Sequence, residues 1–139
     1  AGVADFRLPT LDGRTLGPAD FPGQVVVLEF WATWCAPCHV QARILEEIHR
    51  EYAGEGVQIL GVNVGEQEEV VRAFAARNPY PYPVLLDPAE QVSRDLRVIA
   101  FPTLLVLDQQ REPIWFHSGI TSPQQLRELL AGVGIAAAT

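Results

Sequence analysis

The sequence predicts an α/β fold in which helices flank a central, mostly parallel sheet. Continuous β-branched and aromatic runs alternate along the chain with stretches of helical periodicity, and this alternation is typical of such a sheet. The chain has 139 residues, of which 48% are hydrophobic and 19% charged, as in globular proteins. Because it contains no internal repeat, low-complexity block or linker, residues 1–139 are expected to form one domain.

The first half of the chain predicts a hairpin, a buried strand and a helix. Turn residues such as Asp12-Gly13 break up the first 24 residues, which favours an extended lead-in or a small hairpin. Residues 25–30 are all apolar except for one Glu and predict a strand buried on both faces. From Pro37 to Tyr52 apolar side chains recur at helical spacing, and glycines follow, so a helix is predicted there.

The second half continues the alternation. Further strands are predicted at 57–64, 84–86, 103–108 and 114–117. Helices are predicted at about 66–77, at 89–96 and from Ser122-Pro123 onward, where a capping-box pattern begins. The prolines of the 79–83 segment exclude a helix, so that segment must run extended.

The charge balance argues against two classes of partner. Net charge is −7, and all ten basic residues are Arg, without a basic run. Such a chain is a poor ligand for nucleic acid and for an anionic membrane surface. No apolar run approaches the ~20 residues that a membrane helix needs. The chain begins with Ala1 rather than Met, so we expect a processed or trimmed chain whose signal or anchor lies outside this sequence.

The two cysteines lie in one C-x-x-C segment, which is compatible with a redox pair, half a zinc site or a haem attachment. Dithiol exchange needs one attacking thiolate and a second thiol close enough to resolve the mixed disulfide. A strand, a short turn and then a helix put both sulfurs at a helix start, where backbone N–H groups and the helix dipole stabilise a thiolate. Cys35 should therefore attack, and the more buried Cys38 should resolve.

The metal and haem interpretations have less support. Zinc requires four ligands, and the three histidines do not have zinc-knuckle spacing. Cys35 to His39 does match C-x-x-C-H, with His39 as a proximal haem ligand. However, the chain has no Met for the other axial position, although His49 or His117 could substitute, and the motif follows a buried strand. Copper delivery stays open because thiolates favour Cu(I).

Several separated segments resemble the thioredoxin superfamily and, within it, the TlpA/ResA-like thiol–disulfide oxidoreductases. The segments that carry the resemblance are Phe30-Trp31-Ala32-Thr33-Trp34-Cys35-Ala36-Pro37-Cys38, Phe101-Pro102-Thr103, Gly119, the 61–88 stretch and residues 6–13. The resemblance implies a thioredoxin-like fold with an N-terminal hairpin and a central β-α insertion. It also implies a cis peptide bond before Pro102, which would face the disulfide and leave backbone groups around Phe101 free for an extended substrate. Substrate contacts are then expected at Trp34, Pro37, Phe101 and Thr103, with Trp31 also shaping the surface around the sulfurs.

This sequence departs from the thioredoxin pattern at two positions. Where thioredoxins carry a buried Asp it has Glu29, and the neighbouring Lys is replaced at about Gly61. A carboxyl group in an apolar strand should have a raised pKa, which suits a catalytic proton acceptor for Cys38. The alternative is that Glu29 points to a solvated rim. His39 either favours the Cys35 thiolate as a cation or is an exposed spectator.

The activity expected is exchange of a Cys35–Cys38 dithiol or disulfide with cysteine-containing proteins, supplied by an upstream thiol–disulfide donor. The resemblance suggests a monomeric, extracytoplasmic bacterial reductant, which would keep cytochrome or copper-site cysteines reduced during cytochrome c maturation. No metal or organic cofactor is expected. A peroxiredoxin-type thiol peroxidase is the nearest alternative enzyme, but that family has Thr or Ser where this chain has Ala32.

Overall fold

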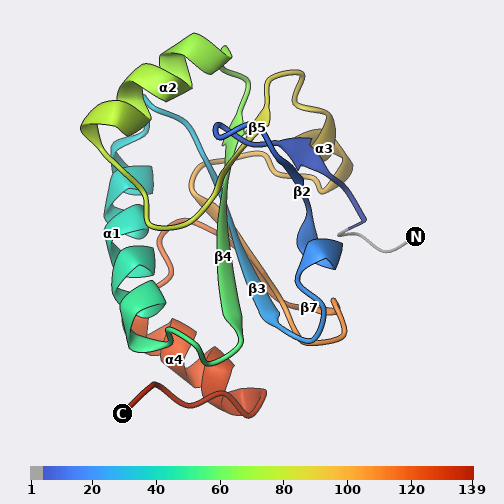
Figure 1. Cartoon of the computed structure of the whole chain (residues 1–139), viewed down its shortest axis with the longest axis vertical. Helices are drawn as coiled ribbons and strands as arrows, with labels where there is room; N and C mark the ends of the chain where they lie inside the picture. The colour runs from blue at the N-terminus through green and yellow to red at the C-terminus, as the bar shows by residue number, and fades with distance from the viewer. Residues whose placement is uncertain (1–4) are drawn as a thin grey trace.

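The computed structural model describes residues 5–139, and its centre is a five-stranded sheet (Figure 1). The strands are β3 (Val25–Trp31), β4 (Val57–Val64), β5 (Val84–Asp87), β6 (Thr103–Leu107) and β7 (Pro113–Ser118), in the order β5-β4-β3-β6-β7. β3 pairs in parallel with β4, and β4 with β5, whereas β6 is antiparallel to both β3 and β7. Four strands therefore share one direction and β6 alone is reversed, which gives the mixed sheet of a thioredoxin-like fold.

The central strand β3 is buried along its whole length, as the unbroken apolar run predicts. Successive side chains point to opposite faces of a strand, so β3 contributes to two cores. Val26, Leu28 and Phe30 enter one apolar cluster, while Val25 and Val27 enter the other. The position of Glu29 in this alternation puts its side chain on the face of Val25 and Val27.

Two helices cover the face of the sheet that carries Glu29. α1 (Ala36–Glu51) contributes Leu45 and Ile48 to the core there, and α4 (Pro123–Gly132) contributes Leu126 and Leu130. The predicted capping box at the start of α4 is confirmed: the Ser122 hydroxyl accepts from the Gln125 N–H, and the Gln125 side chain accepts from the Ser122 N–H.

The opposite face is covered by the N-terminal segment and by a short helix, α3 (Gln91–Asp95). Strands β1 (Leu8–Pro9) and β2 (Thr15–Leu16) form the predicted hairpin, followed by the short 3-10 helix Pro18–Asp20. Leu8, Leu16 and Leu96 pack against the β3 cluster. The sheet is thus enclosed between α1 and α4 on one side and the hairpin and α3 on the other (Figure 1).

The central insertion runs from β4 through α2 (Glu68–Arg77) to β5. α2 begins two residues later than predicted: its N-cap Gln67 has an extended backbone, and the Glu66 carboxylate before it accepts hydrogen bonds from Thr33 and Asn63. α3 is also shorter than the predicted 89–96. The Asp87 carboxylate accepts from the backbone N–H groups of Gln91 and Ser93, so Asp87 at the end of β5 sets where α3 starts.

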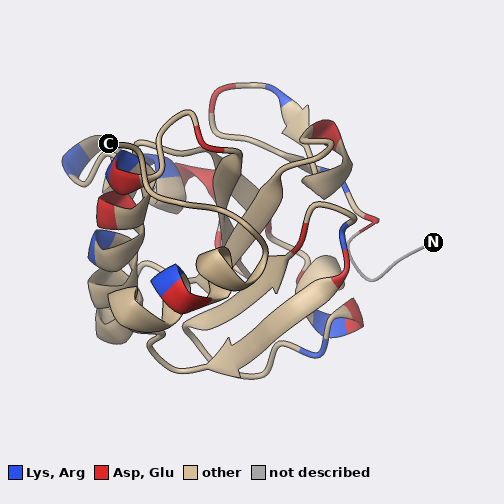
Figure 2. Ribbon diagram, turned by 90° about the horizontal axis from the view of Figure 1, so that it is seen from below, with Lys and Arg blue, Asp and Glu red and all other residues tan. Residues whose placement is uncertain are grey.

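Arginine residues are dispersed among acidic ones over several elements of residues 5–139 (Figure 2). Arg127 of α4, for example, pairs with both Glu47 and Glu51 of α1. Within the same range, no helix has the length and apolar character that crossing a bilayer demands.

A buried glutamine joins α1 to the loop before α4. The Gln41 side chain is fully buried. Its Nε2 donates to the Thr121 carbonyl at 3.1 Å, and its Oε1 accepts from the Thr121 N–H at 2.7 Å. One side chain therefore satisfies both backbone polar groups of a buried loop residue.

Replacing Gln41 with Leu leaves the N–H and carbonyl of Thr121 buried without partners. We expect Gln41→Leu to lower the free energy of unfolding by about 2–4 kcal/mol, because each unpaired buried group costs about 1–3 kcal/mol. Urea denaturation measures this loss. The matched control is Gln124→Leu on the exposed side of α4, expected within about 0.5 kcal/mol of the wild type. Equal stabilities for the two variants would contradict the bridging role of Gln41.

Candidate active site

Cys35 and Cys38 form a disulfide at the start of α1, with their Cα atoms 5.3 Å apart. Cys35 is the N-cap residue, and its sulfur accepts a hydrogen bond from the Cys38 N–H at 3.2 Å. Cys35 is 4% exposed and Cys38 is 1% exposed, so the order of exposure is the predicted one. A thiolate at Cys35 would face the unpaired N–H groups and the positive end of the helix dipole, which lower the pKa of a thiol.

Exposed apolar side chains surround the disulfide. Trp34 is 72% exposed, and its ring centroid lies 6.0 Å from that of Phe101, which packs against the cluster of the two cysteines. Pro37 is exposed in the first turn of α1. Ile99, two residues before Phe101, is 91% exposed and was not among the predicted site residues. Its position before the Phe101-Pro102 segment could have indicated it.

The Phe101–Pro102 peptide bond is cis, as the resemblance implies. Within residues 5–139, the backbone N–H and carbonyl of Phe101 form no hydrogen bond. Thr103, expected as a substrate contact, is fully buried. Its hydroxyl donates to the Ala100 carbonyl at 2.6 Å and lies 3.1 Å from the Ser118 hydroxyl. Its side chain is therefore buried and bonded to the loop before β6 and to the end of β7.

A carboxylate from the central insertion braces the loop before Cys35. Glu66 accepts from the Thr33 N–H at 2.8 Å, from the Thr33 hydroxyl and from the Asn63 amide at 2.8 Å. His39 approaches the same loop from α1, with Nε2 2.9 Å from the Thr33 carbonyl and its ring stacked on Phe74. His39 is half-buried and bonded, so it is not the exposed spectator considered above.

Glu29 is 2% exposed, which excludes the solvated-rim interpretation. It lies two residues before Trp31, which clusters with Cys35 and Cys38, and on the same face of β3. Within the described residues its Oε2 has no hydrogen-bond partner. Burial away from water raises the pKa of this carboxyl well above its usual range. It thus has the pKa direction expected of a proton acceptor.

Trp31 is a correction to the predicted surface. It is 3% exposed, and its ring packs 5.3 Å from Tyr80 and 5.8 Å from Phe74. As the last residue of β3, it points toward α2, whose Phe74 covers it. Trp31 therefore belongs to the core beneath the disulfide, and Trp34 and Phe101 alone of the three aromatics shape the surface.

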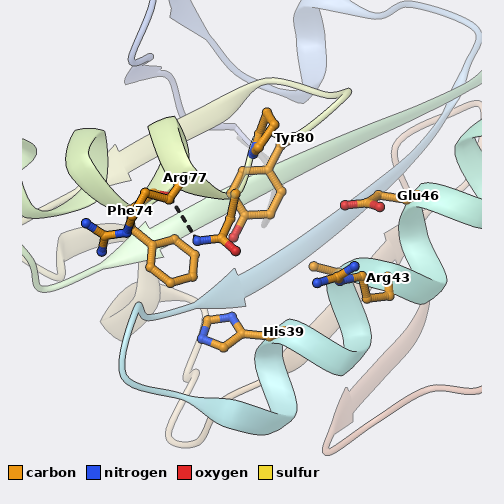
Figure 3. Close-up of a pocket in the computed structure, with 9 residues that line it drawn as sticks. His39, Arg43, Glu46, Phe74, Arg77 and Tyr80 are labelled. Atoms are coloured by element: carbon orange, nitrogen blue, oxygen red, sulfur yellow. Dashed lines mark hydrogen bonds between the residues drawn. The ribbon is translucent and has the colours of Figure 1, made fainter.

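A cavity of about 230 Å³ lies between α1 and α2, beside the active-site loop (Figure 3). His39, Arg43 and Glu46 project into it from α1, and Phe74 lines it from α2. Tyr80 closes its inner side. This cavity gives the half-buried Tyr80 ring contact with solvent.

Within residues 5–139, no group of three or more His, Cys, Asp and Glu side chains is arranged to hold an ion. Both cysteines are bonded to each other, and His39 is directed to the Thr33 carbonyl.

The fold and the disulfide at the helix start define a dithiol–disulfide exchange protein of the thioredoxin fold. Residues 2–112 match the AhpC/TSA family. The ResA thiol-disulfide oxidoreductase of Geobacillus thermodenitrificans is 33% identical over 129 residues, which are 93% of this chain and 74% of that protein. The chain therefore belongs to the AhpC/TSA family and, within it, to the ResA-like thiol–disulfide oxidoreductases.

Solved structures of thiol–disulfide exchange proteins have the same fold as this chain. A DsbF homologue of Corynebacterium diphtheriae has a TM-score of 0.83 at 29% identity, over 95% of this chain and 86% of that one. The exposed lipoprotein thioredoxin Etrx1 of Streptococcus pneumoniae has a TM-score of 0.83 at 30% identity, over 93% of this chain and 99% of that one. The protein is thus an enzyme of thiol–disulfide exchange, and its substrates are cysteine-containing proteins.

The raised pKa of Glu29 makes stability depend on pH. The unfolded chain loses this proton near the usual Glu pKa of about 4.3, while the folded protein retains it to higher pH. The wild type is therefore most stable relative to Glu29→Gln below that pH. Between the two pKa values it loses up to about 1.4 kcal/mol per pH unit, because the folded state binds more protons.

Urea denaturation of both proteins across pH 4–9 measures this difference. Glu55→Gln, which removes an exposed carboxyl group in a turn, is the control. A difference between wild type and Glu29→Gln that stays constant with pH would show that the Glu29 pKa is not raised.

Proposed function

We propose that this enzyme is an extracytoplasmic reductant of protein disulfides, with Cys35 as the attacking residue and Cys38 as the resolving residue. The observation that carries the proposal is the Cys35 sulfur at the N-cap of α1, beside an exposed apolar surface. A sulfur in that place is stabilised as a thiolate and is the one that a protein substrate meets first.

In the first step, the Cys35 thiolate attacks one sulfur of the substrate disulfide. A bond forms between Cys35 and that sulfur, the substrate S–S bond breaks, and the other substrate sulfur leaves as a thiolate. The Cys38 N–H that donates to the Cys35 sulfur supports the negative charge before the attack.

In the second step, Cys38 gives its proton to Glu29, through water, and its thiolate attacks the Cys35 sulfur. The Cys35–Cys38 disulfide forms and the substrate leaves as a second thiolate, so two electrons pass from the enzyme to the substrate. A carboxylate with a raised pKa is a stronger base than an ordinary one, which suits Glu29 for this transfer.

Substrate would lie across Trp34, Pro37 and Phe101, joined by Ile99. These side chains offer apolar contact, and the unpaired backbone of Phe101 offers a carbonyl and an N–H to an extended chain. Pro102 comes directly after Phe101, and the cis peptide bond between them sets the direction of the Phe101 backbone. The Thr103 hydroxyl, which donates to the Ala100 carbonyl, holds the same loop in place.

Three further features of the proposal concern the location, the oligomeric state and the partners of the protein. The Streptococcus relative is an exposed lipoprotein, which supports an extracytoplasmic location for this chain. The net charge of −7 supports solubility and a monomer that meets its partners singly. An upstream dithiol must return electrons to the Cys35–Cys38 disulfide after each turnover, and cytochrome cysteines are the substrates that the ResA-like relationship favours.

Single cysteine variants test the two roles. Cys38→Ser retains the attacking thiolate but cannot resolve, so it should accumulate a mixed disulfide with a disulfide-containing protein. Cys35→Ser should lose exchange and trap nothing. Non-reducing electrophoresis and mass spectrometry of the adduct measure this. An adduct that formed through Cys38 in Cys35→Ser, and not through Cys35, would reverse the assignment.

The direction of electron flow is tested by the reduction potential of the Cys35–Cys38 pair. We expect a value of about −250 mV or below, in the range of reducing thioredoxin-type pairs. Equilibration in dithiothreitol buffers, followed by tryptophan fluorescence, measures it, and Cys35→Ser supplies the baseline. A reduction potential of about −120 mV would make the protein an oxidant.

A further inference from the structure

Three buried side-chain oxygens have no hydrogen-bond partner within residues 5–139: Glu29 Oε2, Asn63 Oδ1 and the Tyr82 hydroxyl. Asn63 still donates from its amide nitrogen to Glu66, which leaves Glu29 and Tyr82 to be considered together. Both side chains are almost completely buried, at 2% and 5% exposed. A buried polar group without a partner is costly, so two such groups in one compartment favour an arrangement in which they satisfy each other.

The sheet register places these side chains around one glycine. Gly61 of β4 is the parallel partner of Glu29 on β3, so both positions face the same side of the sheet. A Cβ atom on Gly61 would lie 3.2 Å from a ring carbon of Tyr82 and 3.3 Å from the indole nitrogen of Trp31. The Tyr82 ring therefore fills the space that a side chain at Gly61 would occupy, next to Glu29. Tyr82 also packs in the apolar cluster of that face.

We propose that Tyr82 is a positioning residue for Glu29: its phenol donates to one enclosed water that donates in turn to the Glu29 carboxylate, and thereby supports the charged form that receives the Cys38 proton. This inference rests on the proposed role of Glu29 as proton acceptor. It assigns to a tyrosine of the loop before β5 the task of charge support in a chain that contains no Lys.

Other polar groups also face this compartment: the Trp31 indole nitrogen lies beside the same position of Gly61, and the unpartnered Asn63 Oδ1 is two residues further along β4. On the remaining elements packed against this compartment, β6 places Leu104 opposite Glu29, and α4 contributes apolar side chains such as Leu126. α1 contributes Cys38, Arg43 and Glu46, of which the last two line the outer cavity with Tyr80 (Figure 3). The Tyr80 and Tyr82 rings lie 5.6 Å apart. Tyr80 is half-buried and Tyr82 is 5% exposed, so Tyr80 is the nearer of the two to solvent.

The test removes one hydroxyl from each tyrosine. Reduced protein is mixed with an aromatic disulfide reagent that releases a coloured thiolate; the first release reports attack by Cys35 and the second reports resolution by Cys38. We expect Tyr82→Phe to move the pH dependence of the second release upward by about one pH unit, because a carboxylate that loses a hydrogen-bond donor has a higher pKa. The first release should keep the wild-type profile. Tyr80→Phe is the matched control and should leave both profiles unchanged.

Glu29→Gln separates this inference from the function beneath it. It should remove the carboxylate-dependent limb of the second release, and the Glu29→Gln, Tyr82→Phe double variant should then match Glu29→Gln alone. If Glu29→Gln alters the second release and Tyr82→Phe does not, the inference about Tyr82 is overturned and Glu29 keeps its role. If Glu29→Gln changes nothing, the proton-acceptor role itself is overturned.

Stability supplies a second measurement. If the phenol supports the Glu29 carboxylate, Tyr82→Phe should be less stable than the wild type at pH values where Glu29 is charged. The loss of stability should be smaller at pH values where Glu29 is neutral. If Tyr82→Phe is equally or more stable at every pH, the hydroxyl has no partner and the inference is overturned.

Discussion

The complete burial of β3 between two paired neighbours is the constraint on which the site depends. Hydrogen bonds to β4 on one side and to β6 on the other fix the register of this strand, and apolar clusters cover both of its faces. The chain that leaves β3 at Trp31 therefore emerges at a fixed point, and four residues later it places Cys35 at the start of α1. Glu29 lies on the same strand, two residues before Trp31, so β3 fixes the position of both the disulfide and the buried carboxyl group.

Two carboxylates near the disulfide illustrate opposite solutions to burial. Glu66 is half-buried and accepts three hydrogen bonds, which tie the insertion to the loop before Cys35. Glu29 is buried more deeply and leaves Oε2 without a partner in the described residues. The first arrangement stabilises the loop and the second costs folding free energy, since an apolar side chain would fit the surrounding core better. A group that is expensive for the fold and suited to proton transfer is consistent with a chemical role.

Local patterns predicted most of the fold. The apolar run at 25–30, the helical spacing after Pro37 and the Ser122-Pro123 start each depend on neighbours in sequence, and each is confirmed. The exceptions depend on distant contacts. Glu66, which was expected inside α2, lies before the helix and bonds to Thr33, and Trp31 is buried because Phe74 of α2 packs over it. Periodicity contains no information about such partners, since they are brought together only when the insertion packs on the sheet.

The residues around Glu29 show the same limit at the site itself. Sequence alone shows that Gly61 lacks a side chain, but not what occupies the space. The structure fills it with Tyr82 and Trp31, whose atoms would lie 3.2 and 3.3 Å from a Cβ on Gly61. Gly61 is therefore suited to this packing, because even a Cβ atom there would require one of the two rings to shift by a few tenths of an ångström. The surroundings of the buried acid are set by three positions that are distant in sequence and act together, and a change at one of them alters the space available to the other two.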